Sequence, residues 1–263
     1  LHYPLRRQRQ MCIRDSNKGR WHIRDYGRGL HYEHLTQKEN DEKLDHPKVI
    51  GKFGIGLKDA LATFDRKGVR VSIKSRFGNI TLGKSEKHGF EDLITLHANI
   101  SPPSDLNFIG TDFLLEGCTD KDMEKAKNLF LKFSGEKIIE ETKYGEVLER
   151  VNDSARVYIN GVKVAEESNF LFSYNIKSLT KSIKKALNRE RTNVGRTAYS
   201  DRVKSILLEC KSRDVAERLV DDLKGYQDGT IHDELAWLDV GVHACKLLNH
   251  LENVVFFTAL SGK

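Results

Sequence analysis

Two glycine-rich elements constrain this chain more than any other feature of its sequence. Asp25-Tyr26-Gly27-Arg28-Gly29 ends a predicted strand, and Gly51-Lys52-Phe53-Gly54-Ile55-Gly56-Leu57-Lys58 opens a predicted helix. Glycine tolerates positive φ and lets the backbone approach a ligand closely. A glycine loop at a helix N-terminus aims free N–H groups at a phosphate. An aspartate beside a glycine turn can accept a hydrogen bond from an exocyclic amine such as that of adenine. The pair therefore predicts a nucleotide held at both ends.

Other phosphate-binding loops fit the second element less well. A Walker A loop requires lysine after its second glycine, but Leu57 follows Gly56. The dinucleotide pattern GxGxxG fails because Asp59 stands where its third glycine should be. Each element by itself is also typical of a plain turn, so the inference rests on the two together.

Taken in order, these two elements and Gly110-Thr111-Asp112-Phe113, which begins a later predicted strand, closely resemble the GHKL ATPases (gyrase, Hsp90, histidine kinase and MutL). The form of the glycine box, GKFGIGLK, is more similar to the MORC and Hsp90-like branches than to the histidine kinases. The resemblance implies a Bergerat-type α/β sandwich that binds ATP with Mg²⁺. It also implies ATP hydrolysis that drives lid closure and a rearrangement of domains or of a homodimer.

The resemblance assigns roles to residues at the matching positions. Asp25 would bind the adenine amino group, Gly27 and Gly29 would shape the base pocket, and Thr111 would support the adenine contacts. Residues 30–50 would form a mobile lid. Lys58 would contact a phosphate oxygen, with a solvated surface lysine as the alternative. The remaining nucleotide-binding candidates lie in the glycine box: Gly51, Lys52, Phe53, Gly54, Ile55, Gly56 and Leu57.

The expected fold class is α+β, with a mixed, mostly antiparallel sheet and helices on one face in residues 17–134. Residues 135–263 are expected to form a second α/β, transducer-like domain, with a ribosomal-S5-like fold as the candidate and a shortened C-terminal end. Strands are predicted at 21–25, 69–77, 80–82, 93–100, 110–115, 145–151, 155–164, 170–176 and 254–258, with 145–151 and 155–164 forming a hairpin. Helices are predicted at 58–64, 120–133, 179–188, 201–210, 215–223 and 233–251.

The opening segment, residues 1–16, shows neither helical nor strand periodicity, and we expect it to be non-native or disordered. A basic arm that contacts nucleic acid is the alternative, since the segment holds four arginines and one aspartate. The first GHKL motif should precede Asp25 and supply a glutamate that activates water and an asparagine that helps to bind Mg²⁺. Residues 1–16 contain neither residue type. We therefore expect a nucleotide-binding domain that is incomplete at its N-terminus and that hydrolyses ATP poorly or not at all.

Basic residues before the later helices offer a second phosphate-binding candidate. In related ATPases, a residue of the second domain reaches the γ-phosphate, and Arg189 and Arg191 are the candidates here because guanidinium groups pair bidentately with phosphate oxygens. The alternative is a solvated helix end. Three lysines of the preceding helix, Lys181, Lys184 and Lys185, would widen this region into a nucleic-acid patch or simply form a charged solvent face.

Composition bounds the remaining possibilities. The net charge of the whole chain is only +6, so nucleic-acid binding has weak support from composition. The four cysteines are scattered, which favours reduced thiols over a zinc site, and we expect no metal held by protein ligands alone. No apolar run approaches the length of a membrane span, which predicts a cytoplasmic protein that does not enter membranes.

The sequence leaves more than one class of function open. A GHKL-type ATPase switch is the leading hypothesis, and a module that binds a nucleotide or a partner without hydrolysis is the alternative. A histidine-kinase catalytic domain fits less well, because the glycine box differs from the form usual in those kinases.

Overall fold

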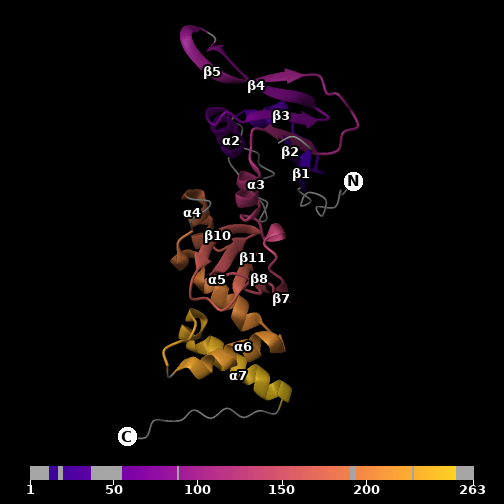
Figure 1. Cartoon of the computed structure of the whole chain (residues 1–263). Helices are drawn as coiled ribbons and strands as arrows, with labels where there is room; N and C mark the ends of the chain where they lie inside the picture. The colour runs from indigo at the N-terminus through magenta and orange to yellow at the C-terminus, as the bar shows by residue number, and fades with distance from the viewer. Residues whose placement is uncertain are drawn as a thin grey trace, which may run out of the picture. The chain divides into compact units, whose positions relative to one another are not determined.

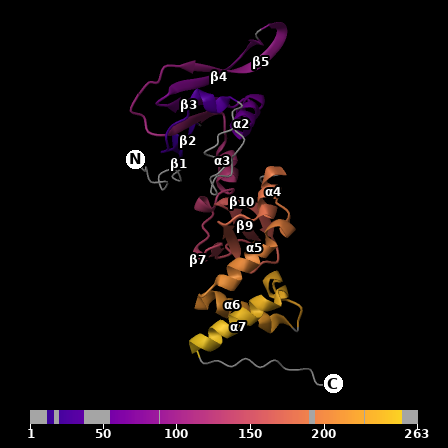
Figure 2. The ribbon, with the colours of Figure 1, turned by 180° about the vertical axis from the view of Figure 1, so that it is seen from behind.

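The computed structural model describes residues 12–16, 20–36, 55–87, 89–189, 194–226 and 228–252. The chain forms two compact units, Leu1–Glu124 and Lys125–Lys263, which we call the N-terminal and C-terminal units (Figures 1 and 2). The described residues form two largely antiparallel sheets and six α-helices, so the predicted α+β class is confirmed. None of the helices in these ranges is long and apolar enough to cross a membrane.

The sheet of the N-terminal unit has the strand order β1-β2-β6-β3-β4-β5, and every neighbouring pair is antiparallel. Alternation along β3 buries Val71 and Ile73 on one face of the sheet, as the period of two predicts. The strands are β1 (Cys12–Ser16), β2 (Arg20–Asp25), β3 (Arg70–Ser75), β4 (Gly78–Lys87), β5 (Phe90–Ser101) and β6 (Thr111–Glu116).

Two helices share the apolar core of this sheet. Leu61 of α2 (Ile55–Arg66) and Met123 of α3 (Asp120–Lys127) belong to the same buried cluster as Val71, Ile73 and Leu115. These three strand residues lie on one face, because Val71 is directly opposite Leu115 and the side chains alternate. The helices of this unit therefore pack on one face of the sheet, as the sequence predicts for this α+β pattern.

Three features of the N-terminal unit differ from the sequence-based expectation. The segment 1–16 is expected to contribute no strand, but Cys12–Ser16 forms β1 and pairs with β2. The turn between the predicted strands 69–77 and 80–82 lies earlier than their bounds imply, at Arg76-Phe77, since Gly78 already pairs with Ser75. The helix expected from residue 58 begins at Ile55. The 3-10 helix at Tyr32–Leu35 agrees with the expectation, for the stretch that starts near residue 31, of a loop with one short helical turn.

The sheet of the C-terminal unit has the order β10-β9-β11-β8-β7, in which β9 and β11 are parallel and the other pairs are antiparallel. One face carries the apolar core, because Val147, Val157 and Tyr174 are register partners and are all fully buried. The strands are β7 (Ile138–Glu141), β8 (Gly145–Leu148), β9 (Ala155–Ile159), β10 (Val162–Glu167) and β11 (Ser173–Ile176).

Four helices follow these strands. Their buried residues, such as Ile183, Val203 and Leu219, belong to the same cluster as the apolar face of the sheet. Glu140 accepts hydrogen bonds from the backbone N–H groups of Lys211 (2.6 Å) and Ser212 (2.9 Å), where a carboxylate favours the start of α6. The helices are α4 (Lys181–Arg189), α5 (Arg196–Glu209), α6 (Arg213–Leu223) and α7 (Leu238–Glu252).

Two predictions for this region were wrong. The helix expected over 120–133 ends at Lys127, because the chain at Phe130 forms a β-bridge with Val162 and Leu131 N–H donates to the Gly161 carbonyl. The hairpin expected from 145–151 and 155–164 does not form, because β11 lies between β8 and β9. Strand β7 is not predicted by the sequence, and the predicted strand at 254–258 lies outside the described residues.

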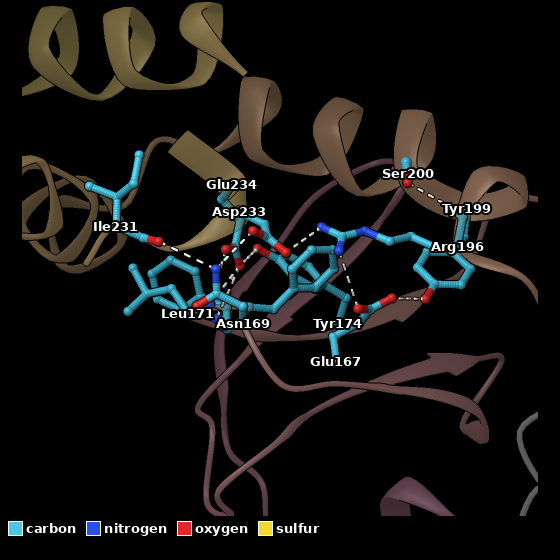
Figure 3. A network of polar contacts seen from close by, with 12 residues as sticks. Glu167, Asn169, Leu171, Tyr174, Arg196, Tyr199, Ser200, Ile231, Asp233 and Glu234 are labelled. Atoms are coloured by element: carbon cyan, nitrogen blue, oxygen red, sulfur yellow. Dashed lines mark hydrogen bonds and ion pairs between the residues drawn. The ribbon is translucent and has the colours of Figure 1, made fainter. Parts of the chain in front are cut away.

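A network of polar contacts joins distant segments of the C-terminal unit (Figure 3). Arg196, at the start of α5, pairs with Asp233 (2.7 Å) and Glu167 (3.5 Å) and stacks over the ring of Phe170 (4.6 Å). Asn169 donates to the Asp233 carboxylate at 2.8 Å. The network thereby fixes the chain between β10 and β11 against α5 and against the segment that precedes α7.

Glu234, in the same network, is fully buried without a cationic partner among the described residues. Its Oε1 accepts hydrogen bonds from Leu171 N–H (2.9 Å), Phe172 N–H (3.2 Å) and Tyr174 O–H (2.8 Å). Burial raises the pKa of this carboxyl above its ordinary value, and the hydrogen bonds act in the opposite direction. Ionised Glu234 therefore costs stability that the protonated form does not.

Glu234→Gln should make the C-terminal unit less sensitive to pH. A folded-state pKa above the unfolded value means that Glu234 contributes stability below about pH 4.5, which is lost as pH rises through the folded pKa. Glutamine retains the acceptor at Oε1 and does not ionise. The free energy of unfolding of the variant should therefore rise relative to that of wild type as pH rises. Urea unfolding between acid and neutral pH, followed by Trp237 fluorescence in a Trp21→Phe background, measures this difference. A difference that stays constant with pH would contradict the assignment.

Candidate functional site

Three polar side chains form a row across the sheet of the N-terminal unit. Asp25 ends β2 opposite Thr111, and Thr111 begins β6 opposite Ser75, the last residue of β3. Directly opposite residues share a face of an antiparallel sheet, so all three lie on the face that carries the apolar core. Thr111 and Ser75 are only 4% and 3% exposed. The sequence-predicted residues Asp25 and Thr111 are thus brought together, and Ser75 joins them.

The Asp25 carboxylate is oriented by the turn that follows it. Gly27 N–H donates to Asp25 Oδ1 at 2.7 Å, the local bond expected of an aspartate that begins a turn. Among the described residues, this is the only hydrogen bond made by the carboxylate, so Oδ2 keeps its capacity to accept. Gly29 has a φ of +91°, which favours glycine, and its Cα faces the Gly110 carbonyl and the ring of Phe77.

Gly110 makes the closest backbone approach in this site. A Cβ at this position would lie 1.8 Å from the Asp25 carbonyl oxygen and 2.8 Å from the Cα of Tyr26, and its φ is +83°. Only glycine fits without a backbone shift, since such contacts are far below van der Waals distance. Gly110 therefore sets the distance between the Asp25 turn and the start of β6.

Ser75 and Phe77 hold the chain that leaves the Asp25 turn. Ser75 Oγ donates to the Leu30 carbonyl at 2.6 Å and accepts from Phe77 N–H at 3.1 Å. The Phe77 ring contacts His31 edge to face, with 5.2 Å between the ring centroids. Sequence reasoning missed both residues, because a serine and a phenylalanine at a hairpin turn have no pattern that distinguishes them from ordinary strand ends.

Arg24 braces the other face of the same strands. Its guanidinium lies 4.4 Å from the ring centre of Phe108 and 5.2 Å from that of Tyr26, within the range of cation–π attraction. On that face His22 also pairs with Asp112 at 2.8 Å. These contacts tie the segment before Thr111 to the strand that ends in Asp25, which supports the row from behind.

The predicted phosphate-binding residues are only partly described. Gly56, Leu57 and Lys58 lie in the first turn of α2, where Leu57 packs against the apolar core. Ile55 begins this helix, and Gly51, Lys52, Phe53 and Gly54 lie outside the described residues, as does most of the expected lid. Of the expected contacts in the C-terminal unit, Arg189 ends α4, and Arg191 lies outside the described ranges.

A pocket of about 330 Å³ lies at the opposite end of the sheet from the row. It is lined by Asp65, Arg70, Glu116 and neighbouring residues, and its carboxylates already pair with Lys84, Arg20 and Arg70. We therefore assign it no ligand. No group of three or more metal-ligating side chains occurs in the part of the chain that the structure describes.

The comparisons with known proteins define a family. Residues 121–213 match the family described as the Mycoplasma pneumoniae MPN635 N-terminal domain. A Mycoplasma pneumoniae protein with the name "Uncharacterized protein" is 40% identical over 187 residues, which cover 70% of this chain and 75% of that protein. A second protein of the same name and organism is 29% identical over 143 residues, 54% of this chain and 40% of that protein. The chain belongs to the family of the first of these two proteins.

Gly110→Ala should destabilise the N-terminal unit much more than Gly68→Ala. Both glycines have positive φ, +83° and +71°, but a Cβ at Gly68 meets nothing within 4 Å. Gly68→Ala should cost about 1–2 kcal/mol from backbone strain alone. Gly110→Ala should cost at least ~2 kcal/mol more, because the Asp25 carbonyl must move. Urea unfolding followed by Trp21 fluorescence in a Trp237→Phe background measures both, and equal losses would contradict the close approach.

Proposed function

We propose that the N-terminal unit binds an adenine nucleotide in the manner of the GHKL ATPases, with Asp25 as the acceptor for the exocyclic amine of adenine. The observation that carries the proposal is the register that sets Asp25 directly opposite Thr111 on the core face of the sheet. The carboxylate has one oxygen held by Gly27 N–H and the other free to accept. Such an arrangement suits a donor amine, because a hydrogen bond to an ionised acceptor is stronger than one to a neutral acceptor.

Glycines allow backbone segments to pack closely around the row. A Cβ at Gly29 would come within 3.1 Å of the Gly110 carbonyl, and a Cβ at Gly110 would come within 1.8 Å of the Asp25 carbonyl. Glycine at these positions is consistent with a base that contacts the backbone closely. In this proposal the Asp25 carboxylate and Thr111 beside it meet the polar edge of adenine.

Phosphates would be held by the glycine box, residues 51–58, whose described part opens helix α2. Free N–H groups at a helix N-terminus attract anions, and Lys58 in the same turn adds a positive charge. Mg²⁺ would reach the site with the phosphates and would neutralise part of their charge. The described residues supply no protein cage for the ion, so we derive no catalytic step from it.

ATP hydrolysis and a rearrangement of domains or of a homodimer are part of this proposal through the resemblance to the GHKL ATPases. The ribosomal-S5-like fold remains the proposal for the C-terminal unit. The alternative is a module that holds a nucleotide or a partner without hydrolysis. Measurable steady-state release of phosphate by the chain would favour the ATPase over the module.

Asp25→Asn should weaken the binding of a non-hydrolysable ATP analogue by about 10-fold or more, because asparagine replaces the charged acceptor by a neutral amide. Asp105→Asn is the matched control, since Asp105 Oδ1 also accepts from an N–H two residues on, Asn107 N–H at 2.8 Å, but is exposed. Calorimetry with Mg²⁺ on the full chain measures both variants.

The control variant should bind as wild type does, and GTP should compete poorly. Equal affinity of the Asp25→Asn variant and the wild type would exclude the adenine role of Asp25. Absence of binding by the wild type would favour the partner-binding module.

A further inference from the structure

Helix α4 carries an unusual density of positive charge. Between Lys177 and Arg196 the sequence has seven basic residues and one acidic residue, and α4 itself, KSIKKALNR, has four basic residues and no acidic one. The helix begins at a Thr180 cap, whose Oγ1 accepts from Ile183 N–H at 3.1 Å. Ile183 and Leu187 are buried in the core of the C-terminal unit. The lysines therefore occupy the opposite, exposed face.

The three lysines of this face have no partner of opposite charge in the described ranges. No ion pair or hydrogen bond joins the side chains of Lys181, Lys184 or Lys185 to another described residue. Many other cations of this unit are paired: Lys143, Lys163, Lys177, Lys204 and Lys224, together with Arg156, Arg196, Arg213 and Arg218, contact carboxylates. The α4 face thus gathers on one helix several charges that no carboxylate of the described residues neutralises.

An ordinary solvated helix face would be built differently. Helix α6 alternates charges, with Arg213 paired to Glu217 and Arg218 paired to Asp214 four residues away. In α4, by contrast, Lys181 and Lys185 stand four residues apart with the same charge, which costs helix stability instead of adding to it. No contact among the described residues offsets this repulsion, which favours a function for the positive charge of α4.

We propose that the exposed lysine face of α4, Lys181, Lys184 and Lys185, binds the phosphate backbone of nucleic acid. The helix rises about 1.5 Å per residue, so the three lysines span roughly 6 Å. Successive phosphates of one DNA strand advance about 3.4 Å along the duplex axis, so flexible lysine side chains can reach neighbouring phosphates of one strand. Lysine suits such contacts, because its ammonium acts as a point charge without demanding one geometry.

The same face of α4 lacks the exposed apolar side chains that an anionic membrane or an acidic protein partner would require. A helix that lies on an anionic membrane exposes apolar residues beside its lysines, but Ile183 and Leu187 are 0% and 8% exposed. An acidic protein partner would need apolar or aromatic anchors, and none of the large exposed apolar side chains described lies between Lys177 and Arg189. The lysines of this face suit phosphate contacts, which predicts binding that depends strongly on salt and little on base sequence.

The test is fluorescence anisotropy of the full chain with short labelled duplexes of DNA and of RNA over a salt series. Wild type should bind with a dissociation constant of about 10⁻⁴–10⁻⁶ M at moderate salt. The triple variant Lys181→Gln, Lys184→Gln, Lys185→Gln should bind at least ~10-fold more weakly. Its slope of log K against log salt should be shallower by about 0.9 for each phosphate that the variant no longer neutralises.

The control variant is Lys137→Gln, Lys211→Gln, Lys246→Gln, which removes the same charge from three exposed lysines on separate segments of the C-terminal unit. It should bind nearly as wild type does. Three results would each overturn the proposal: no binding by wild type, equal binding by the triple variant, or an equal loss in the control variant. Binding of wild type to vesicles of anionic lipid but not to either duplex would overturn it as well.

Discussion

The register of three neighbouring strands is the constraint on which the N-terminal unit depends. Because Asp25, Thr111 and Ser75 stand opposite one another, a shift of one residue in either pairing would turn polar side chains toward the core and apolar ones outward. The contact of Gly110 with the Asp25 carbonyl fixes the same relation between β2 and the start of β6. The site and the core are therefore specified by one set of backbone pairings, and neither can change without the other.

A buried carboxylate has the corresponding role in the C-terminal unit. Glu234 gathers two backbone N–H groups and the Tyr174 hydroxyl in place of a cation. Removing it would leave these donors buried and unsatisfied, which is more costly than the net gain of the bonds themselves. Asp233, beside it, engages Arg196. A single turn before α7 thus holds the chain before β11 and the first residue of α5, segments that are distant in sequence.

The sequence predicts the elements whose causes are local. Alternation in β3 and the glycine box before α2 indicate a strand and a helix that the structure contains, with bounds that differ by a few residues. Elements that depend on pairing with residues far away in the sequence cannot be predicted in this way. The apolar run through Phe130 has the spacing of a helix, but its backbone pairs with Val162. Strand β1 has little alternation and is held by its pairing with β2.

The residues of the candidate site also fall into two groups, those that the sequence indicates and those that only the structure reveals. Asp25 and Thr111 are placed together before the structure by the resemblance of their motifs to those of the GHKL ATPases, and the glycines of each motif are visible in the sequence. Ser75 and Phe77 cannot be placed in this way, since their importance comes only from contacts with Leu30 and His31, more than forty positions away in the sequence.

Ion pairing decides which positive charges are available to bind a ligand. The sequence presents the segment that ends in Arg196 as one group of cations and cannot separate its members. In the structure, Arg196 is held by Asp233, Glu167 and the ring of Phe170, so releasing it to a phosphate would first require breaking those contacts. The α4 lysines have no such cost, because no described carboxylate competes for them. The net charge of the chain is only +6, but this value is an average over the whole molecule. On the exposed face of α4, neighbouring lysines can bind an anion without first breaking an ion pair with a described residue.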